Sequence, residues 1–179
     1  MANRTNHYEA AFEAFLRDRR VAYVAVDEKK RSMLGDGTLK SLDFLVSRAA
    51  AGSWLVDVKG RQFPGGGQYW KNWSTQDDLR SMASWEALFG PAFESLFVFA
   101  YQVIGDRAPL PADQLFWHQG LLYGFVGIRL RDYVRYARPI SARWGTLAMP
   151  AERFRELAEP FEEFLSDDVT LCASSLYAG

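Results

Sequence analysis

The apolar positions of this chain recur first at helical spacing and then at strand spacing. In residues 6–20, NHYEAAFEAFLRDRR, four apolar side chains share one stripe of an amphipathic helix: Tyr8, Phe12, Phe15 and Leu16. Short apolar runs with strand propensity follow at residues 21–28, 41–46 and 54–60. The glycines of MLGDGTLK, residues 33–40, predict a turn between the first two strands.

A second helix and a further strand complete the regular part of the pattern. Residues 74–90 predict a helix, because Ser74 or Thr75 can cap its start and a Gly-Pro pair ends it. Residues 95–103, SLFVFAYQV, are almost continuously apolar, as in a strand that is covered on both faces. The order helix, three strands, helix, strand predicts an α/β fold with a mixed sheet.

The pattern after residue 103 is less regular. Residues 121–150 predict two further strands, or a strand and a short helix. Residues 150–165 predict a helix that begins near Pro150 and is interrupted at Pro160, and the tail 166–179 predicts a loosely ordered end. We therefore expect one domain over residues 1–179, with a core at about 6–103 and a C-terminal β/α elaboration at about 104–179.

Composition narrows the class of protein. Of the 179 residues, 49% are hydrophobic and 15% aromatic, which excludes general disorder. The net charge of -1 argues against avid, non-specific nucleic-acid binding but leaves room for a local basic strip. The single cysteine, Cys172, permits no internal disulfide and fits a reducing compartment. Because the sequence shows no signal-like or membrane-length apolar run, we expect a soluble cytoplasmic protein with no membrane partner.

Charged residues interrupt the strand WLVDVKGR, residues 54–61. Asp57 and Lys59 share one face of this strand, roughly 7 Å apart along the backbone. Asp43 lies on the preceding strand, so the three side chains converge if the two strands are adjacent and in suitable register. Two carboxylates and a backbone carbonyl form a hard-oxygen site suited to Mg²⁺ or Mn²⁺. A nearby lysine can orient a water molecule or stabilise the charge of a phosphate.

The first helix offers a third carboxylate. At 100° per residue, Glu9 falls about 20° from Leu16, on the edge of the apolar stripe. Glu13 lies further toward solvent and has Arg17 at i+4 as a partner. Glu9 is therefore predicted to face inward, and Glu13 to lie at the surface or behind the site.

Each of these residues alone also has an ordinary structural explanation. The Asp57–Lys59 pair can be a solvated strand end or an ion pair, and Asp43 an edge or turn carboxylate. Glu9 can cap its helix as part of the pattern Asn6-x-x-Glu9. His7 beside it fits a surface or cap histidine. An ion pair, however, does not explain a second inward acid on the preceding strand.

This arrangement resembles the motif of the PD-(D/E)XK nuclease superfamily, which includes the archaeal Holliday junction resolvases. That motif has a helix glutamate, a strand aspartate and (D/E)-x-K on the next strand, matched here by Glu9, Asp43 and Asp57-Val58-Lys59 over roughly residues 6–103. More narrowly, HYEAAFE, residues 7–13, matches the motif that names the HYExAFE family of bacterial proteins, a name that carries no established activity. Three features depart from the resolvases: Asp57 stands where they usually have glutamate, the chain has a net charge of -1 rather than a basic one, and residues 104–179 have no counterpart.

The resemblance implies a restriction-endonuclease-like fold and a metal-dependent reaction. The implied fold is an αβββαβ core whose mixed central sheet is flanked by helices. Asp43, Asp57 and the Val58 carbonyl would hold Mg²⁺ or Mn²⁺, with Glu9 binding directly or through water. Lys59 would activate the water that hydrolyses a phosphodiester bond of DNA, and His7 and Glu13 would lie behind these groups. Related nucleases often act as dimers, so a homodimer is allowed.

The loop RQFPGGGQYWKNW, residues 61–73, supplies candidate DNA contacts. Arg61 and Lys71 can meet phosphates, and the aromatic residues Tyr69, Trp70 and Trp73 can stack on unpaired bases. The alternative is that these aromatic side chains pin the loop onto the core. The three glycines lack the lysine-serine ending of a phosphate-binding loop, which argues against a nucleoside-triphosphate site.

The densest basic stretch is RLRDYVRYAR, residues 129–138. As a strand, it would place Arg129, Arg131 and Arg135 on one face, which permits a nucleic-acid track; Arg138 closes the stretch. The more common explanation is a solvated face paired with acids such as those of the final helix, and we favour it.

Three hypotheses follow from the sequence. The first is a metal-dependent nuclease acting on DNA, with branched or single-stranded forms as candidate substrates. The second is a nucleic-acid-binding or interaction domain on a nuclease fold that does not cleave. The third is an unrelated α/β protein whose acids are structural.

Overall fold

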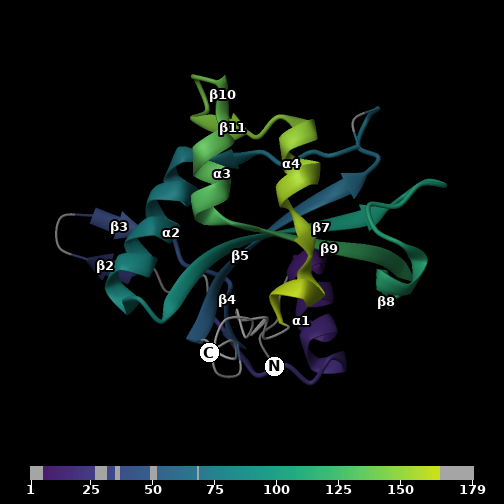
Figure 1. Ribbon diagram of the computed structural model, residues 1–179, viewed down its shortest axis with the longest axis horizontal. Helices are drawn as coiled ribbons and strands as arrows, with labels where there is room; N and C mark the ends of the chain where they lie inside the picture. Colours follow the sequence, from purple (N-terminus) through teal and green to yellow (C-terminus); the bar gives the residue numbers. More distant parts are fainter. Residues whose placement is uncertain (1–5, 27–31, 35–36, 49–51, 68, 166–179) are drawn as a thin grey trace, which may run out of the picture.

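A mixed β-sheet forms the centre of the protein (Figure 1). The structure, a computed structural model, describes residues 6–26, 32–34, 37–48, 52–67 and 69–165. The strand order is β1-β4-β5-β7-β9-β12, with β8 paired to β9. The strands of this sheet are β1 (Tyr23–Ala25), β4 (Phe44–Arg48), β5 (Gly52–Phe63), β7 (Phe93–Val103), β8 (Phe116–His118), β9 (Leu121–Arg129) and β12 (Glu159–Pro160).

Helices flank the sheet, and two small sheets adjoin it. The helices are α1 (His7–Asp18), α2 (Gln76–Phe89), α3 (Leu130–Tyr136), α4 (Ala151–Leu157) and the 3-10 turns η1 (Ala112–Gln114) and η2 (Phe161–Phe164). The small sheets are the pair β2 (Ser32–Leu34) and β3 (Gly37–Leu39), and the three strands β6 (Ser74–Thr75), β10 (Arg138–Ser141) and β11 (Thr146–Ala148).

The predicted αβββαβ order is present as α1-β1-β4-β5-α2-β7. Strands β5 and β7 run parallel because α2 crosses over between them, and the other pairs in the sheet are antiparallel. Strands β2 and β3 pair antiparallel, which the pattern did not indicate, and the centre of the predicted turn at 33–40, residues 35–36, lies outside the described residues.

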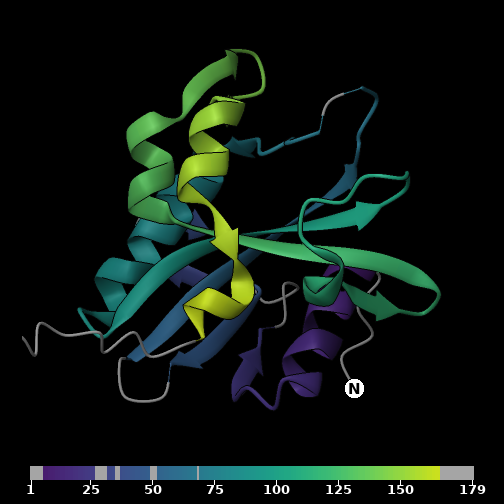
Figure 2. The ribbon, with the colours of Figure 1, turned by 45° about the vertical axis from the view of Figure 1, so that its right-hand side comes forward.

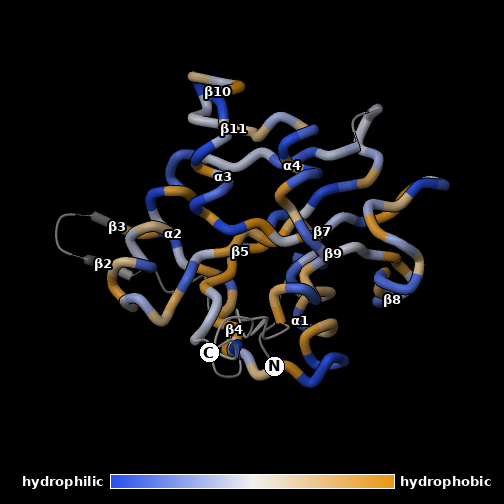
Figure 3. Tube along the Cα trace, viewed as in Figure 1, coloured by the Kyte–Doolittle hydropathy of each residue, from blue (hydrophilic) through white to orange (hydrophobic). Residues whose placement is uncertain are grey.

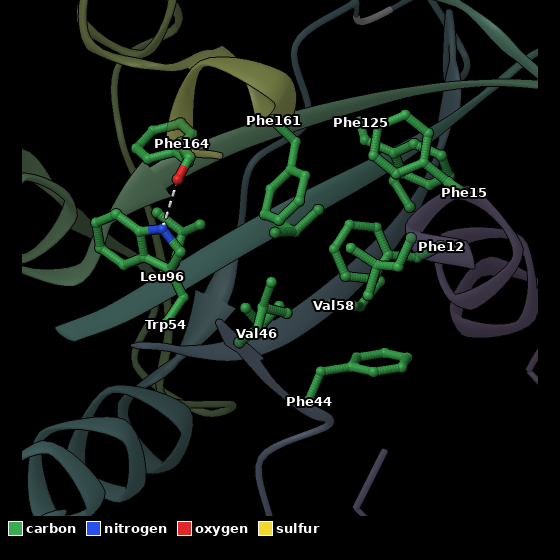
Figure 4. Close-up of a cluster of buried hydrophobic side chains, with 14 of the residues drawn as sticks. Phe12, Phe15, Phe44, Val46, Trp54, Val58, Leu96, Phe125, Phe161 and Phe164 are labelled. Carbon is green, nitrogen blue, oxygen red and sulfur yellow. Dashed lines mark hydrogen bonds between the residues drawn. The ribbon is translucent and has the colours of Figure 1, made fainter. Parts of the chain in front are cut away.

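The first face of the sheet is covered by α1 and η2. Phe12 of α1 is fully buried, and its ring centroid lies 5.3 Å from that of Phe125 and 4.8 Å from that of Phe161 (Figure 4). The indole Nε1 of Trp54 donates a 2.8 Å hydrogen bond to the carbonyl of Phe164 (Figure 4). The beginning and the end of the described chain therefore build this core together.

The second face is covered by α2, α3 and α4 (Figure 2). Met82, Tyr133 and Phe154 from these three helices pack with Phe97 and Phe99 of β7. Hydrophobic residues follow the central strands through the molecule, as expected for strands with both faces covered (Figure 3).

Residues after 103 differ from the prediction in two places. The helix predicted at 150–165 ends at Leu157, and β12 and η2 follow, because Pro160 cannot continue a helix. Residues 130–136 form α3, so a strand over 129–138 was wrong. The tail 166–179, with Cys172, lies outside the described residues. Among the described helices, none combines the length and apolar character that crossing a membrane requires.

Candidate active site

Strand β5 loses its pairing with β4 at the site. Strand β4 begins at Phe44, which is opposite Val56, so beyond this point the ladders of the described residues pair β5 only with β7. Asp43 lies just before β4, and its carboxylate takes the place of a further strand partner: the Val58 N–H donates to Asp43 Oδ2 at 2.6 Å. This bond fixes Asp43 against the strand that carries Asp57 and Lys59.

A cavity of about 810 Å³ opens at this edge, between the first turns of α1 and α2. All of the sequence-predicted motif residues line it: Glu9, Asp43, Asp57, Val58 and Lys59. Lys40 and Asp78 line it as well, and the sequence interpretation had assigned no role in the site to either of them. The structure thus brings together residues from α1, the start of β4, β5 and α2.

Lys59 lies between two carboxylates. Its Nζ is 2.8 Å from Asp57 Oδ2 and 3.2 Å from Asp78 Oδ2. Asp78 is also 2.9 Å from the Nζ of Lys40. The ion pair considered for Asp57 and Lys59 is therefore present, within a larger group of charges.

The start of α2 holds Asp78 in place. Thr75 and Asp78 form a capping box: the Thr75 hydroxyl accepts from the Asp78 N–H at 3.2 Å, and the Asp78 carboxylate accepts from the Thr75 N–H at 3.0 Å. The Ser74 hydroxyl donates to the same carboxylate at 3.0 Å. The Thr75-x-x-Asp78 spacing was the sequence signal for this residue, but helix capping explained it without reference to the site.

Burial and neighbouring charges shift the pKa values of the three groups in different directions. Burial, together with the charge of Asp78, raises the pKa of Asp57, and Lys59 offsets only part of this. Burial alone would lower the pKa of Lys59, but the two carboxylates outweigh it, so the pKa is raised. The pKa of Asp78 is lowered, because Lys59, Lys40 and the hydrogen bonds of the cap outweigh its burial. Lys59 is consequently a cation that can orient a water molecule or stabilise a phosphate charge, rather than a neutral base.

The predicted ranking of the two helix acids is confirmed. Glu9 is only 5% exposed, and its Oε1 accepts from Asn6 Nδ2 at 2.5 Å. Asn6 also caps α1 through the Tyr8 N–H, so the capping explanation and the inward position of Glu9 hold together. Glu13 pairs with Arg17 at 2.6 Å, as expected for the outer acid.

His7 takes a place next to the site rather than in its wall. Its Nδ1 lies 2.7 Å from the hydroxyl of Tyr123, and its ring lies against that of Tyr8, with centroids 3.9 Å apart. The imidazole therefore fixes the start of α1, the helix that carries Glu9.

Gly60 allows α1 to approach β5 closely. A Cβ atom at Gly60 would lie 2.1 Å from Cδ2 of Tyr8, far inside contact distance. Since Tyr8 directly precedes Glu9, the glycine of VKG helps to set where the helix acid lies.

Replacing Gly60 with alanine should lower the free energy of unfolding by about 1–3 kcal/mol, the usual range for overpacking. Urea denaturation of Gly60→Ala measures this loss. The double variant Tyr8→Ala/Gly60→Ala removes the ring that the new methyl group meets, so it should be more stable than additivity of the two single variants predicts. Additive effects would show that the contact between Tyr8 and Gly60 is not the cause.

The residues predicted to contact DNA do not line the cavity, and they fall into two groups. The ring centroid of Trp70 lies 5.4 Å from that of Phe63 and 5.9 Å from that of Tyr101. Trp70 therefore fixes the loop to the core, which was the alternative to base stacking. Tyr69 and Trp73 are 38% and 42% exposed and remain accessible.

Of the two basic residues of the same loop, Arg61 contacts the protein through its guanidinium and Lys71 through its backbone carbonyl. The guanidinium of Arg61 lies 3.8 Å from the centre of the Trp73 ring and donates to the carbonyls of Gly60 and Trp73. Burial lowers the pKa of Arg61. Lys71 is half-buried, and its carbonyl accepts from the Tyr101 hydroxyl at 3.0 Å.

The basic stretch 129–138 does not form the strand face that a nucleic-acid track required. Arg131, on α3, lies 3.9 Å from Glu94 and 4.0 Å from Asp132, and Arg135 lies over the Tyr136 ring. The favoured explanation, a solvated face paired with acids, holds for the exposed Arg131, but its acids in the described part of the chain belong to β7 and α3 rather than to the final helix. The neighbouring Arg138 begins β10 and is exposed.

Comparison with solved structures identifies the architecture. The chain superposes on Hjc, a Holliday junction resolvase of Archaeoglobus fulgidus, with a TM-score of 0.54 and 11% identity over 89% of this chain and 98% of that chain. The fold is restriction-endonuclease-like. This likeness is one of fold, and it extends beyond residues 6–103 into the part without a predicted counterpart. The chain matches no family model and no curated protein, so membership of the HYExAFE family stays a prediction.

The cavity fits a hard divalent cation in the kind of donors it offers. Asp43, Asp57 and Glu9 provide carboxylates, and Val58 a backbone carbonyl, the ligand types that Mg²⁺ prefers. In the arrangement that the described residues adopt, no three acidic, histidine or cysteine side chains are gathered as a metal cluster. The Lys59 ammonium beside Asp57 and the Val58 N–H on Asp43 occupy these carboxylates instead.

Proposed function

We propose that the protein is a metal-dependent nuclease that hydrolyses phosphodiester bonds of DNA. The observation that carries this proposal is the meeting of Glu9, Asp43, Asp57 and Lys59 in one cavity of a resolvase-like fold. These residues come from three separate segments, so their meeting is a consequence of the fold and not of sequence proximity.

The side chains have distinct roles in the proposed reaction. Asp43 and Asp57, with the carbonyl of Val58, would hold Mg²⁺ or Mn²⁺, and Glu9 would bind it directly or through water. A bound cation would supply charge neutralisation at the phosphate and a lower pKa for a bound water. Lys59 orients the attacking water and stabilises the negative charge that develops on the phosphate oxygens. Asp78 positions Lys59 from the side opposite Asp57.

Metal binding is the first test of this proposal. Millimolar Mg²⁺ or Mn²⁺ should raise the melting temperature of the wild-type protein, because a ligand that binds only the folded state stabilises it. The variant Asp57→Ala should lose this shift, whereas Asp113→Ala, an exposed acid in η1 that does not line the cavity, should keep it. Equal shifts in both variants would place the metal elsewhere.

Cleavage is the second test. The purified protein should hydrolyse at least one of branched, nicked, single-stranded and duplex DNA in the presence of Mg²⁺ or Mn²⁺. Loss of activity in Asp57→Ala, prepared identically, excludes a contaminating nuclease. A metal-linked thermal shift without cleavage of any of these substrates would contradict the enzymatic proposal.

One observation favours a second function, a domain that binds nucleic acid without cleaving it. Lys59 is held by two carboxylates, and the described side chains form no metal cluster. If these ion pairs persist in the presence of metal, the cavity is a structural charge network. The thermal-shift experiment separates the two functions, since only the nuclease requires the metal-dependent shift through Asp57.

A further inference from the structure

The hairpin formed by β10 and β11 presents an exposed aromatic and basic surface. Trp144 in its turn is 70% exposed and Ile140 is 61% exposed. The guanidinium of Arg143 lies 5.0 Å from the centre of the Trp144 ring. Residues 138–149 contain two arginines, Arg138 and Arg143, and no acidic residue, in a chain whose net charge is -1. Such a surface favours a partner that is both anionic and aromatic.

The hairpin is joined to the wall of the cavity. Strand β11 pairs with β6 through Thr146 and Thr75, and the Gln76 N–H donates to the carbonyl of Gly145 at 2.8 Å. Thr75 is the cap of α2, and its hydroxyl contacts both the Asp78 N–H and, at 3.4 Å, the Nζ of Lys40. The backbone of Trp144 therefore lies at most roughly 12 Å from that of Thr75, because Trp144 is two residues before Thr146 along the chain and Thr146 is one strand spacing from Thr75. In Figure 1, the hairpin lies beyond the start of α2, which is the end of the helix that β6 joins to β11.

A few nucleotides of a DNA strand are enough to span the distance between Trp144 and Thr75. Even in a duplex, each nucleotide of one strand advances about 3.4 Å along the axis. An exposed indole next to a guanidinium is a stacking platform for a base, a contact that is largely independent of sequence. Bases inside a duplex are already stacked on both faces and cannot use such a platform. The chemistry of the hairpin therefore selects unpaired bases.

We propose that the β10–β11 hairpin binds an unpaired DNA strand adjacent to the cavity, with a base stacked on Trp144 and phosphates near Arg138 and Arg143. This inference rests on the proposed nuclease function, and it makes single-stranded or branched DNA the substrate class. It also gives part of the region after residue 103 a role in substrate choice.

Binding without turnover tests the hairpin separately from catalysis. Fluorescence anisotropy in EDTA measures the affinity for three labelled probes: single-stranded DNA, a duplex with a single-stranded overhang, and the same duplex with blunt ends. Trp144→Ala should weaken binding of the first two roughly 5- to 150-fold, the loss expected for one stacked base, and change blunt-duplex binding less than about twofold. Trp117→Ala is the matched control, because Trp117 is 68% exposed on β8, outside the hairpin.

Two results would overturn the inference. One is an equal effect of Trp144→Ala and Trp117→Ala, and the other is an equal loss of affinity for all three probes. If the wild type cleaves DNA and Trp144→Ala keeps its single-strand affinity, the hairpin proposal fails and the nuclease stands. If single-strand affinity depends on Trp144 but no probe is cleaved with metal, the nuclease fails and the hairpin stands. A circular dichroism spectrum and melting temperature close to wild type establish that each variant is folded.

Discussion

Lys59→Ala should cleave DNA roughly 10²- to 10⁴-fold more slowly than the wild type, the range expected when a positioned catalytic group is removed. The ammonium of Lys59 is the cation that the cavity places beside Asp57, and it stays charged because two carboxylates outweigh the effect of its burial. Single-turnover cleavage with saturating enzyme measures the chemical step. The metal-linked thermal shift should persist, because the proposed metal ligands remain.

Two further variants separate the roles within this group of charges. Lys40→Ala removes a cation that contacts Asp78 but is not paired with Asp57, so its effect on the chemical step should be much smaller. Asp78→Asn should lie between the two, because it leaves Lys59 in place with one carboxylate partner fewer. Equal rates for Lys59→Ala and Lys40→Ala would contradict the assignment of Lys59 to the reaction.

Phe12→Ala should lower the free energy of unfolding by about 3–5 kcal/mol. The ring is fully buried, and its centroid lies 5.3 Å from that of Phe44 and 4.8 Å from that of Phe161. Its removal therefore leaves a cavity between three separate segments. Urea denaturation with constant m-value measures the change. Phe12→Leu retains most of the volume and should lose clearly less. A loss below about 1 kcal/mol for Phe12→Ala would show that α1 is not held through this core.

The sequence predicted the αβββαβ part of the fold because each element there carries its own local signal. The stripe of Phe12, Phe15 and Leu16 identified α1, and continuous apolar runs identified β5 and β7. The signals failed where tertiary context decides. Residues 130–136 carry both helical and strand-like spacing, and packing of Tyr133 into the second core selects the helix. Residues 159–160 pair with β9, which no local pattern indicates.

The candidate site was only partly visible in the sequence, for a similar reason. Asp43, Asp57 and Lys59 are informative because charged residues in apolar runs need an explanation. Asp78 has an ordinary one, the capping box, and its second contact, with Lys59, depends on how α2 crosses over β5. Leu42 shows the limit of strand alternation: strict alternation places it beside Phe44 and Val46, but it packs in the opposite core, because β4 begins only at Phe44.

The packing of Phe12 against Phe161 also constrains how the chain reaches its native state during synthesis. Translation proceeds from the N-terminus, so α1 leaves the ribosome long before η2. Phe44 follows early, but Phe12 lacks the ring of Phe161 until nearly all described residues have been made. Strand β7 likewise has no hydrogen-bonded neighbour on one side until β9 has been made. Such contacts between distant parts of the sequence predict slow, largely post-translational folding. Nascent chains that stop near residue 103 would expose both an apolar helix face and an unpaired central strand. Surfaces of these two kinds bind chaperones and promote aggregation.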